Sequence, residues 1–335
     1  MGLLDRLFGR TAQATSDPLL ARALERAAEL VEPRLKLARD WQTRLAPGVT
    51  AAIDVARDVA LRLQTTHELA PECWADDATL RALLPAADSV APLLSRAREL
   101  QRFLRTHPRA GEACAVLDTG FQIKQVYGAA LVDGVLRQDV ALEQAEFGDP
   151  QLRVVAADLE SLQQAVGSRV FNDLMLAATR RLADADKRGN ELNVTRAMLQ
   201  ARLRLLDARE DTLLDRGSEA APDDAAAEIA ELQLRLQDIQ GAIEATGRGV
   251  DGLDRQLDLV RDTLLAARAS IVFEQRRLRL DAMNRVVPAG VADGRKVVFE
   301  HAQSAGRSQA FVAVRVQRAA VPADGLALAA VERAL

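Results

Sequence analysis

The chain carries two long segments in which apolar residues recur at alternating steps of three and four. The first runs from Phe171 to Leu213 and the second from Ile229 to Leu278. This spacing is typical of the a and d positions of heptads, which place one apolar stripe along a helix for contact with a partner helix. The two segments therefore predict a pair of long helical arms over residues 159–287, each about 65–80 Å long.

A short polar segment joins the two predicted arms. Residues 215–224 include Gly217, Ser218 and Pro222, which are typical of a turn rather than of a helix interior. A connection of this length allows the arms to fold back on each other within one chain. We therefore expect an antiparallel coiled-coil hairpin with its tip near 215–224. Pairing of the arms between two chains would satisfy the same pattern and is the alternative.

Residues 17–111 show helical periodicity interrupted by several breaks. Ser16 and Pro18 give a helix start, with an N-cap candidate followed by proline in the first turn. Pro47 and Gly48 are expected to end the first helical stretch, and the sequence HPRAG at 107–111 ends the last one. The segment predicts an α-helical bundle.

The period changes in two segments on either side of the predicted hairpin. In the first, Asp133 and Gly134 separate two apolar runs, which is the strongest short signal for a β-hairpin. In the second, Val312, Val314 and Val316 alternate with other residues as in a half-buried strand. Because the helical arms return to the same end, we expect the two segments to complete one small antiparallel or mixed sheet.

The predicted fold class is therefore mainly α with a small β head, an α+β arrangement in which the coiled-coil hairpin is inserted between the two halves of the sheet. The expected parts are a short amphipathic helix and linker at 1–16, the helical bundle at 17–111, one β segment at 112–158, the hairpin at 159–287, a C-terminal β-hairpin at 288–320 and a tail at 321–335.

The first ten residues form a candidate amphipathic helix. Leu3, Leu4, Leu7 and Phe8 share one face of it. The structural interpretation is a helix docked on its own bundle. The functional interpretation is contact with a partner or a membrane surface, which would be weak because the face is small and no polybasic zone accompanies it.

Gly247, Gly249 and Gly252 have the spacing G-x-G-x-x-G of a dinucleotide-binding loop. That loop follows a strand and opens a helix inside a βαβ unit. Here the heptad steps continue across the glycines from Ile243 to Leu253. The context therefore argues against a cofactor site and favours a weak point or hinge in the second arm, since glycine costs about 1 kcal/mol relative to alanine in a helix.

A basic stretch is expected at the end of the second arm. Arg276, Arg277 and Arg279 lie close together there. Cations at the C-terminal end of a helix interact favourably with its dipole, which is the structural interpretation. A docking patch for an acidic partner is the functional alternative.

Composition and charge narrow the function classes. Aromatic residues make up 3% and charged residues 27% of the 335-residue chain, and the formal net charge is −4 with acids and bases interspersed. This composition favours long helices, and it lacks the positive field that nucleic-acid binding requires. No apolar run is long enough for a membrane-spanning helix, and the start of the chain is too short and charged for a secretory signal. We expect a bacterial protein in the cytoplasm, or at the periphery of the inner membrane.

The residue types that carry metal or catalytic chemistry are scattered along the sequence. His67, His107 and His301 have no partner at ligand spacing, and Cys73 and Cys114 form no CxxC pair. The cysteines are read as free thiols in a reducing compartment. Nucleophile-elbow, zincin and phosphate-loop motifs are missing from the sequence. We therefore assign no catalytic residue, no cofactor and no metal ligand.

These observations predict a non-enzymatic coiled-coil scaffold or adaptor that acts through protein–protein contacts, including self-assembly into a homo-oligomer. One alternative is a peripheral membrane protein anchored by its N-terminal amphipathic helix. A second alternative is an enzyme with an unrecognised site in the β head.

Overall fold

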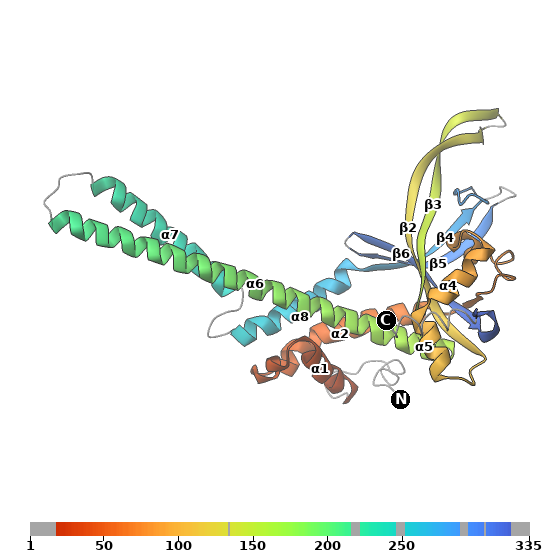
Figure 1. Cartoon of the computed structure of the whole chain (residues 1–335), viewed down its shortest axis with the longest axis horizontal. Helices are drawn as coiled ribbons and strands as arrows, with labels where there is room; N and C mark the ends of the chain where they lie inside the picture. Colours follow the sequence, from red (N-terminus) through yellow and green to blue (C-terminus); the bar gives the residue numbers. More distant parts are fainter. Residues whose placement is uncertain are drawn as a thin grey trace. The chain divides into compact units, whose positions relative to one another are not determined.

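The computed structural model describes residues 18–132, 135–215, 222–245, 252–288, 294–304 and 306–322. The fold is mixed α+β, with long helices and one six-stranded sheet (Figure 1), so the predicted class is confirmed at that level. The chain divides into two compact units. The sheet unit contains the described residues of 53–171 and of 267–322. The helical unit contains the described residues of 18–52 and of 172–266.

The sheet has the strand order β3-β2-β6-β5-β4. Neighbouring strands along this path are antiparallel, and the short β1 pairs with β6 in parallel. β2 pairs with β6 from Glu112 to Gly120. The two β segments that flank the helical arms in the sequence therefore belong to one sheet. The strands are β1 Thr66–Glu68, β2 Glu112–Val132, β3 Val135–Ala156, β4 Val272–Leu280, β5 Arg295–Ser304 and β6 Arg307–Gln317.

Three short helices supply much of the core on one face of the sheet. They are α3 Ala78–Leu83, α4 Val90–Arg96 and α5 Arg98–Thr106. Leu80 and Leu100 are fully buried in a cluster with sheet residues such as Val312. The structure does not keep residues 17–111 together as one helical bundle. The later helices of this segment pack on the sheet, and residues 66–68 form a strand of that sheet.

Three aromatic rings form the centre of this core. Phe121, Phe147 and Phe299 come from β2, β3 and β5, and their ring centroids lie 5.0–5.4 Å apart. Phe299 is 1% exposed. Edge-to-face arrangements at this spacing add to the stabilisation that burial provides.

The helical unit is built from segments far apart in the sequence. α1 Pro18–Val31, the 3-10 turn η2 Pro33–Leu37 and α7 Pro222–Ala245 belong wholly to it. Three further helices have residues in both units: α2 Trp41–Arg62, α6 Leu159–Asp215 and α8 Gly252–Ser270. α7 runs back beside α6 (Figure 1), and Arg196 donates a hydrogen bond of 2.9 Å to the Gln240 side chain between them. None of the helices in the described ranges combines the length and the apolarity needed to cross a bilayer.

Side-chain exposure in the helical unit follows the predicted heptad steps. The positions at these steps are all buried or half-buried, whereas most residues between them in α6 and α7 are exposed. They are Met175, Ala178, Leu182, Ala185, Gly189, Leu192, Arg196, Leu199 and Leu203 in α6, Ile229, Leu232, Leu236, Ile239 and Ile243 in α7, and Leu253, Leu257, Val260 and Leu264 in α8.

The heptad steps fail beyond residue 270. They predict helix as far as Leu278, but α8 ends at Ser270 and β4 begins at Val272. β-Branched and aromatic side chains favour strands, and the segment starts with Ile271, Val272 and Phe273. Pairing with β5 along the whole of β4 supplies the hydrogen bonds that a helix would have made internally.

The predicted break at Pro47 and Gly48 is wrong, since α2 continues through both residues. Gly48 instead marks a close approach of two helices. A methyl group on Gly48 would lie 3.0 Å from both the Cα and the carbonyl oxygen of Arg261 in α8. Glycine at this position therefore allows the two backbones to come together.

Candidate interaction surfaces

β2 and β3 continue as a two-stranded ribbon beyond the last residue of β2 that pairs with β6. β6 pairs with β2 only as far as Gly120. We define the ribbon as residues 121–128 of β2 and 140–147 of β3, which pair with each other without a register shift. It extends away from the rest of the sheet (Figure 1). A two-stranded ribbon has little independent stability in water, so its surface is a candidate for contact with another strand.

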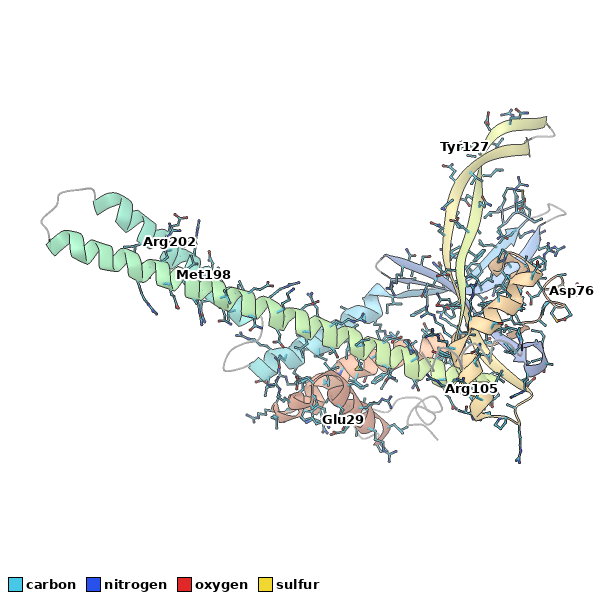
Figure 2. All side chains as sticks on the ribbon, viewed as in Figure 1. Glu29, Asp76, Arg105, Tyr127, Met198 and Arg202 are labelled. Carbon is cyan, nitrogen blue, oxygen red and sulfur yellow. The ribbon has the colours of Figure 1, made fainter. Side chains whose placement is uncertain are left out.

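Apolar side chains are exposed on one face of the ribbon. Tyr127 is 72% exposed and lies well out along the ribbon (Figure 2), and Ile123 is 40% exposed. They share a face with Phe121, which is buried at the base of the ribbon, because alternate residues of a strand point to the same side. The face therefore changes from core to exposed apolar surface along the strand.

The outer edge of β3 is partly covered near the base of the ribbon. The Val286 N–H donates to the Glu143 carbonyl at 2.8 Å, and the Ala145 N–H donates to the Asn284 carbonyl at 2.9 Å. These bonds show that Glu143 and Ala145 direct their backbone groups away from β2.

The pairing with β3 fixes how β2 presents its own edge. Gln125 lies opposite Glu143 and Ile123 lies opposite Ala145. Directly opposite residues of an antiparallel pair both point their backbone groups either inward or outward. The N–H and C=O groups of Ile123, Gln125 and Tyr127 therefore face the open edge of β2, along which the described chain places no further strand.

The arginines singled out in the sequence lie on β4 rather than at the end of a helix, so the predicted favourable contact with a helix dipole is wrong. Arg276 forms an ion pair with Glu274 at 2.5 Å. Arg277 donates to the Gln275 side chain at 2.6 and 2.9 Å, and Arg279 donates to the Gly294 carbonyl at 2.8 Å. All three are held by their own neighbours, and docking of an acidic partner on them stays a prediction.

Two other predicted sites fall largely outside the described residues. Leu3, Leu4, Leu7 and Phe8 lie outside them, as do Gly247 and Gly249. Gly252 is the first residue of α8. Membrane contact by the first set and a hinge at the second therefore stay predictions.

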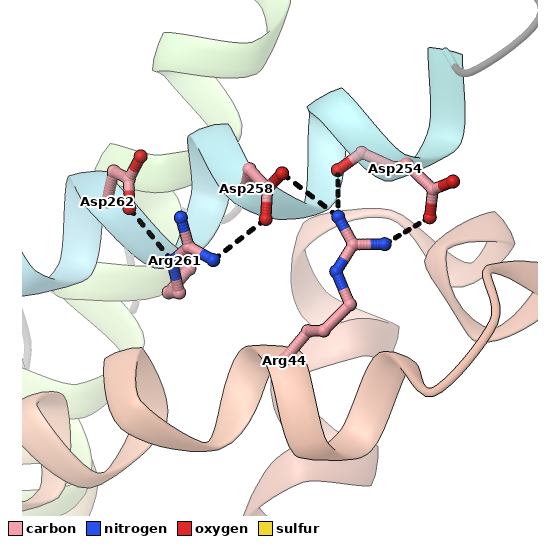
Figure 3. Close-up of polar contacts among 5 residues, drawn as sticks. All are labelled: Arg44, Asp254, Asp258, Arg261 and Asp262. Atoms are coloured by element: carbon pink, nitrogen blue, oxygen red, sulfur yellow. Dashed lines mark hydrogen bonds and ion pairs between the residues drawn. The ribbon is translucent and has the colours of Figure 1, made fainter.

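An arginine clamp joins α2 to α8 in the helical unit (Figure 3). Arg44 donates to the side chain of Asp254, to the Asp254 carbonyl at 3.0 Å and to Asp258 at 2.9 Å. Arg261 bonds Asp258 and Asp262, each at 2.9 Å. The hydrogen bond to Asp258 raises the pKa of Arg44, so the clamp is a fixed positive charge held between carboxylates.

His301 connects three strands of the sheet through its side chain. Its Nδ1 lies 3.1 Å from Glu274 on β4, and its Nε2 lies 2.8 Å from the Ser308 hydroxyl on β6. The hydrogen bond from His301 lowers the pKa of Glu274. An ionised carboxylate can only accept, so Nδ1–H donates to Glu274, and in the neutral tautomer with this proton Nε2 accepts from the serine hydroxyl. Glu274 and Ser308 lie 27 and 7 positions from His301 in the sequence. Only the register of the strands brings the three side chains together.

His67 is held by an aspartate that also caps a helix. Asp77 accepts hydrogen bonds from the backbone N–H groups of Thr79 and Leu80 at 2.8 and 3.0 Å, and its other oxygen lies 2.6 Å from His67 Nδ1. Burial opposes ionisation of Asp77, but the bond from His67 and the two N–H groups outweigh it and lower its pKa. Within the described part of the chain, no three His, Cys, Asp or Glu side chains are grouped as a metal site would require.

We expect replacement of Asp77 by Ala to destabilise the protein by about 1 kcal/mol through loss of the helix cap. Asp77→Asn is the control that keeps a capping oxygen and removes the charge. Because the folded-state pKa is depressed, the stability that ionisation provides is present above the unfolded pKa of about 3.9 and is lost as pH falls through the lower folded pKa. Urea unfolding at pH 7 and pH 3 measures both effects; a wild-type advantage over Asp77→Asn that grows at low pH would contradict the assignment.

Comparisons of the chain with protein-family models, with curated proteins and with solved structures found no match.

Proposed function

We propose that the protein is a self-associating scaffold that pairs with a second copy of itself through the open edge of β2. The observation that carries this proposal is the edge itself: Ile123, Gln125 and Tyr127 present their backbone groups outward while two of their side chains are exposed and apolar. Addition of a strand to such an edge is a common mode of protein association.

The pattern of β2 is self-complementary, which favours a second copy as the occupant. If two β2 edges pair antiparallel about a two-fold axis at Gln125, Ile123 of each chain lies opposite Tyr127 of the other. Aromatic and β-branched side chains are a favourable cross-strand pair, and the symmetry would form it twice. Lys124 would lie opposite Val126, so no like charges face each other directly.

A cysteine at the symmetry centre tests this arrangement. In a hydrogen-bonded antiparallel pair the two Cα atoms are about 5.5 Å apart, within the range of about 4.4–6.8 Å that a disulfide spans. Gln125→Cys, in a Cys73→Ser background that leaves only the buried Cys114, should form a covalent dimer on mild oxidation.

Gln122→Cys is the matched control for the cross-link. It lies on the same strand, but in the symmetric pair its two copies would be about 20 Å apart, so it should stay monomeric on a denaturing gel. Light scattering of the wild-type protein gives the second measurement. A monomer at every concentration overturns the proposal, and so does a dimer that Gln125→Cys fails to cross-link, since the chains would then pair elsewhere.

We further infer that α6 and α7 pair within one chain as the predicted antiparallel coiled coil and give the scaffold its reach. The covered heptad positions in both helices and the hydrogen bond from Arg196 to Gln240 support this inference. The alternative, in which the arms pair between chains, predicts a dimer that persists when the β2 edge is blocked.

A second candidate function is acyl transfer by Ser308. Glu274, His301 and Ser308 have the hydrogen-bond order of an orienting carboxylate, a general base and a nucleophile. His301 Nε2 would take the hydroxyl proton as Ser308 Oγ bonds to the carbonyl carbon of an ester, and it would return that proton to the alcohol that leaves as the original acyl C–O bond breaks. This function ranks second because the base is 3% exposed whereas the side chain of the carboxylate is 41% exposed.

Covalent labelling tests the second candidate. A fluorophosphonate probe should modify Ser308 in the wild-type protein, with no labelling of Ser308→Ala and full labelling of Ser304→Ala, which changes a serine on the neighbouring strand. If the wild-type protein is not labelled, the three side chains are a cross-strand hydrogen-bond row that stabilises the sheet, and the acyl-transfer function is removed.

A further inference from the structure

A tightly bonded turn follows β4 in the sheet unit. The Asp281 carboxylate accepts hydrogen bonds from the Met283 N–H at 2.8 Å, from the Arg285 N–H at 2.9 Å and from Arg285 Nε at 2.6 Å. Asn284 has a positive φ of 57° and donates its amide to the Ala82 carbonyl of α3 at 3.2 Å. The turn is therefore fastened to itself, to α3 and, through the bonds to Glu143 and Ala145, to β3.

A hollow of about 550 Å³ lies between this turn, α3 and the start of β5. This size is in the range of pockets for small organic ligands. Its apolar lining includes Ala82, Leu280 and Val297, and its cations are Arg81, Arg285 and Arg295. The hollow thus combines an apolar wall with three guanidinium groups.

The positive charge of the hollow is not balanced by its own residues. Asp281 is the one carboxylate among the described lining residues, and its oxygens are already occupied by Arg285 and two backbone N–H groups. Arg81 lies over the Trp74 ring, 5.6 Å from its centroid, and Arg295 donates to the Ala75 carbonyl at 3.5 Å. In the described chain no ion pair joins Arg81 or Arg295 to a carboxylate, so two positive charges remain for a ligand.

We propose that this hollow, which we name the arginine pocket, binds a small organic molecule carrying a doubly charged oxyanion, such as a phosphomonoester. Guanidinium groups match the geometry of phosphate oxygens and bind them through paired hydrogen bonds. Two unbalanced charges match a dianion, and the apolar wall provides contact for the organic group. The stacking of Arg81 on Trp74 holds one guanidinium in a fixed orientation.

Phenyl phosphate is the probe for a binding test on the full-length protein, with inorganic phosphate and benzoate as comparisons. Isothermal titration calorimetry should show saturable one-to-one binding of phenyl phosphate. Inorganic phosphate, which lacks the apolar group, and benzoate, which carries one charge, should each bind more weakly.

The variant pair Arg81→Gln with Arg295→Gln should weaken phenyl phosphate binding about tenfold or more, because each lost contact is a hydrogen bond to a charged group. In the described chain neither arginine has an ion pair to lose, so circular dichroism should match the wild type, and melting should fall only slightly through loss of the Trp74 contact and the hydrogen bond to Ala75. Arg277→Gln is the matched control: it removes one exposed charge on β4 outside the pocket and should leave affinity unchanged.

Three outcomes overturn the proposal. They are the absence of saturable binding to any of the three probes, an equal loss of affinity in Arg277→Gln, which would indicate diffuse electrostatic attraction, and equal affinity for inorganic phosphate and phenyl phosphate, which would remove the organic ligand. Because the pocket shares no residue with the β2 edge, these results are independent of the self-association experiment.

Discussion

Replacement of Phe299 by Ala should lower the free energy of unfolding by about 3–5 kcal/mol, the range for removal of a large buried aromatic side chain. Phe299 is 1% exposed and its ring contacts both Phe121 and Phe147 at centroid distances of 5.0 and 5.4 Å. The substitution removes buried apolar contact area and both aromatic pairs, and it leaves a cavity beside Phe121 and Phe147. Urea unfolding followed by circular dichroism measures the change.

Two further variants make this result interpretable. Phe299→Leu keeps most of the volume and should cost clearly less than Phe299→Ala. Val272→Ala shortens an exposed side chain on β4, 54% exposed, and should change stability by less than about 0.5 kcal/mol. A loss below about 1 kcal/mol in Phe299→Ala would mean that the aromatic cluster is not the packing centre of the sheet unit.

Two glycine-to-alanine substitutions in helices should act in opposite directions. Gly48→Ala places a methyl group 3.0 Å from backbone atoms of Arg261, and a backbone cannot move aside as a side chain can. Overpacking of this kind costs about 1–3 kcal/mol, and alanine returns up to about 1 kcal/mol of helix propensity. The net expectation is a destabilisation of up to about 2 kcal/mol.

Gly241→Ala is the matched control for Gly48→Ala. Gly241 also lies inside a helix, α7, but a methyl group there meets nothing within 4 Å. Only the helix-propensity gain remains, so this variant should be up to about 1 kcal/mol more stable. Thermal and urea unfolding of the two variants test the contrast. Stabilisation by both substitutions would show that α2 and α8 do not approach closely at Gly48.

Helix over the greater part of 159–270 could be predicted from the sequence because a heptad pattern reflects a local geometry. Steps of three and four select the covered side of a helix whatever the partner is, and the burial of Leu182, Leu232 and Leu257 follows those steps. The same steps failed at Ile271–Leu278, because strand pairing with β5 is a tertiary contact that the pattern of one segment does not record. The helix break predicted at Pro47 was also wrong, because α2 continues through this residue.

The candidate sites depend on strand register, which the sequence did not reveal. The hairpin signal at Asp133-Gly134 predicted two strands. It did not indicate that the pairing of β2 with β6 would stop at Gly120 and leave the rest of the β2 edge open. His301 was read as isolated because Glu274 and Ser308 meet it only across β4, β5 and β6. The arginine pocket combines residues from α3 and from the turn after β4, some 200 positions apart, as the contact of Asn284 with Ala82 shows.

The arginine clamp has a consequence for the order in which the chain can fold during synthesis. Arg44 bonds partners 210 and 214 positions later in the chain. A ribosome must therefore release most of the polypeptide, including all the strands before β4, before α2 meets α8. Contacts of such long sequence separation slow folding, and an unfinished N-terminal helix pair would expose apolar surface in the meantime. A nascent chain truncated before Asp254 should consequently depend on chaperones to a degree that the full-length chain does not.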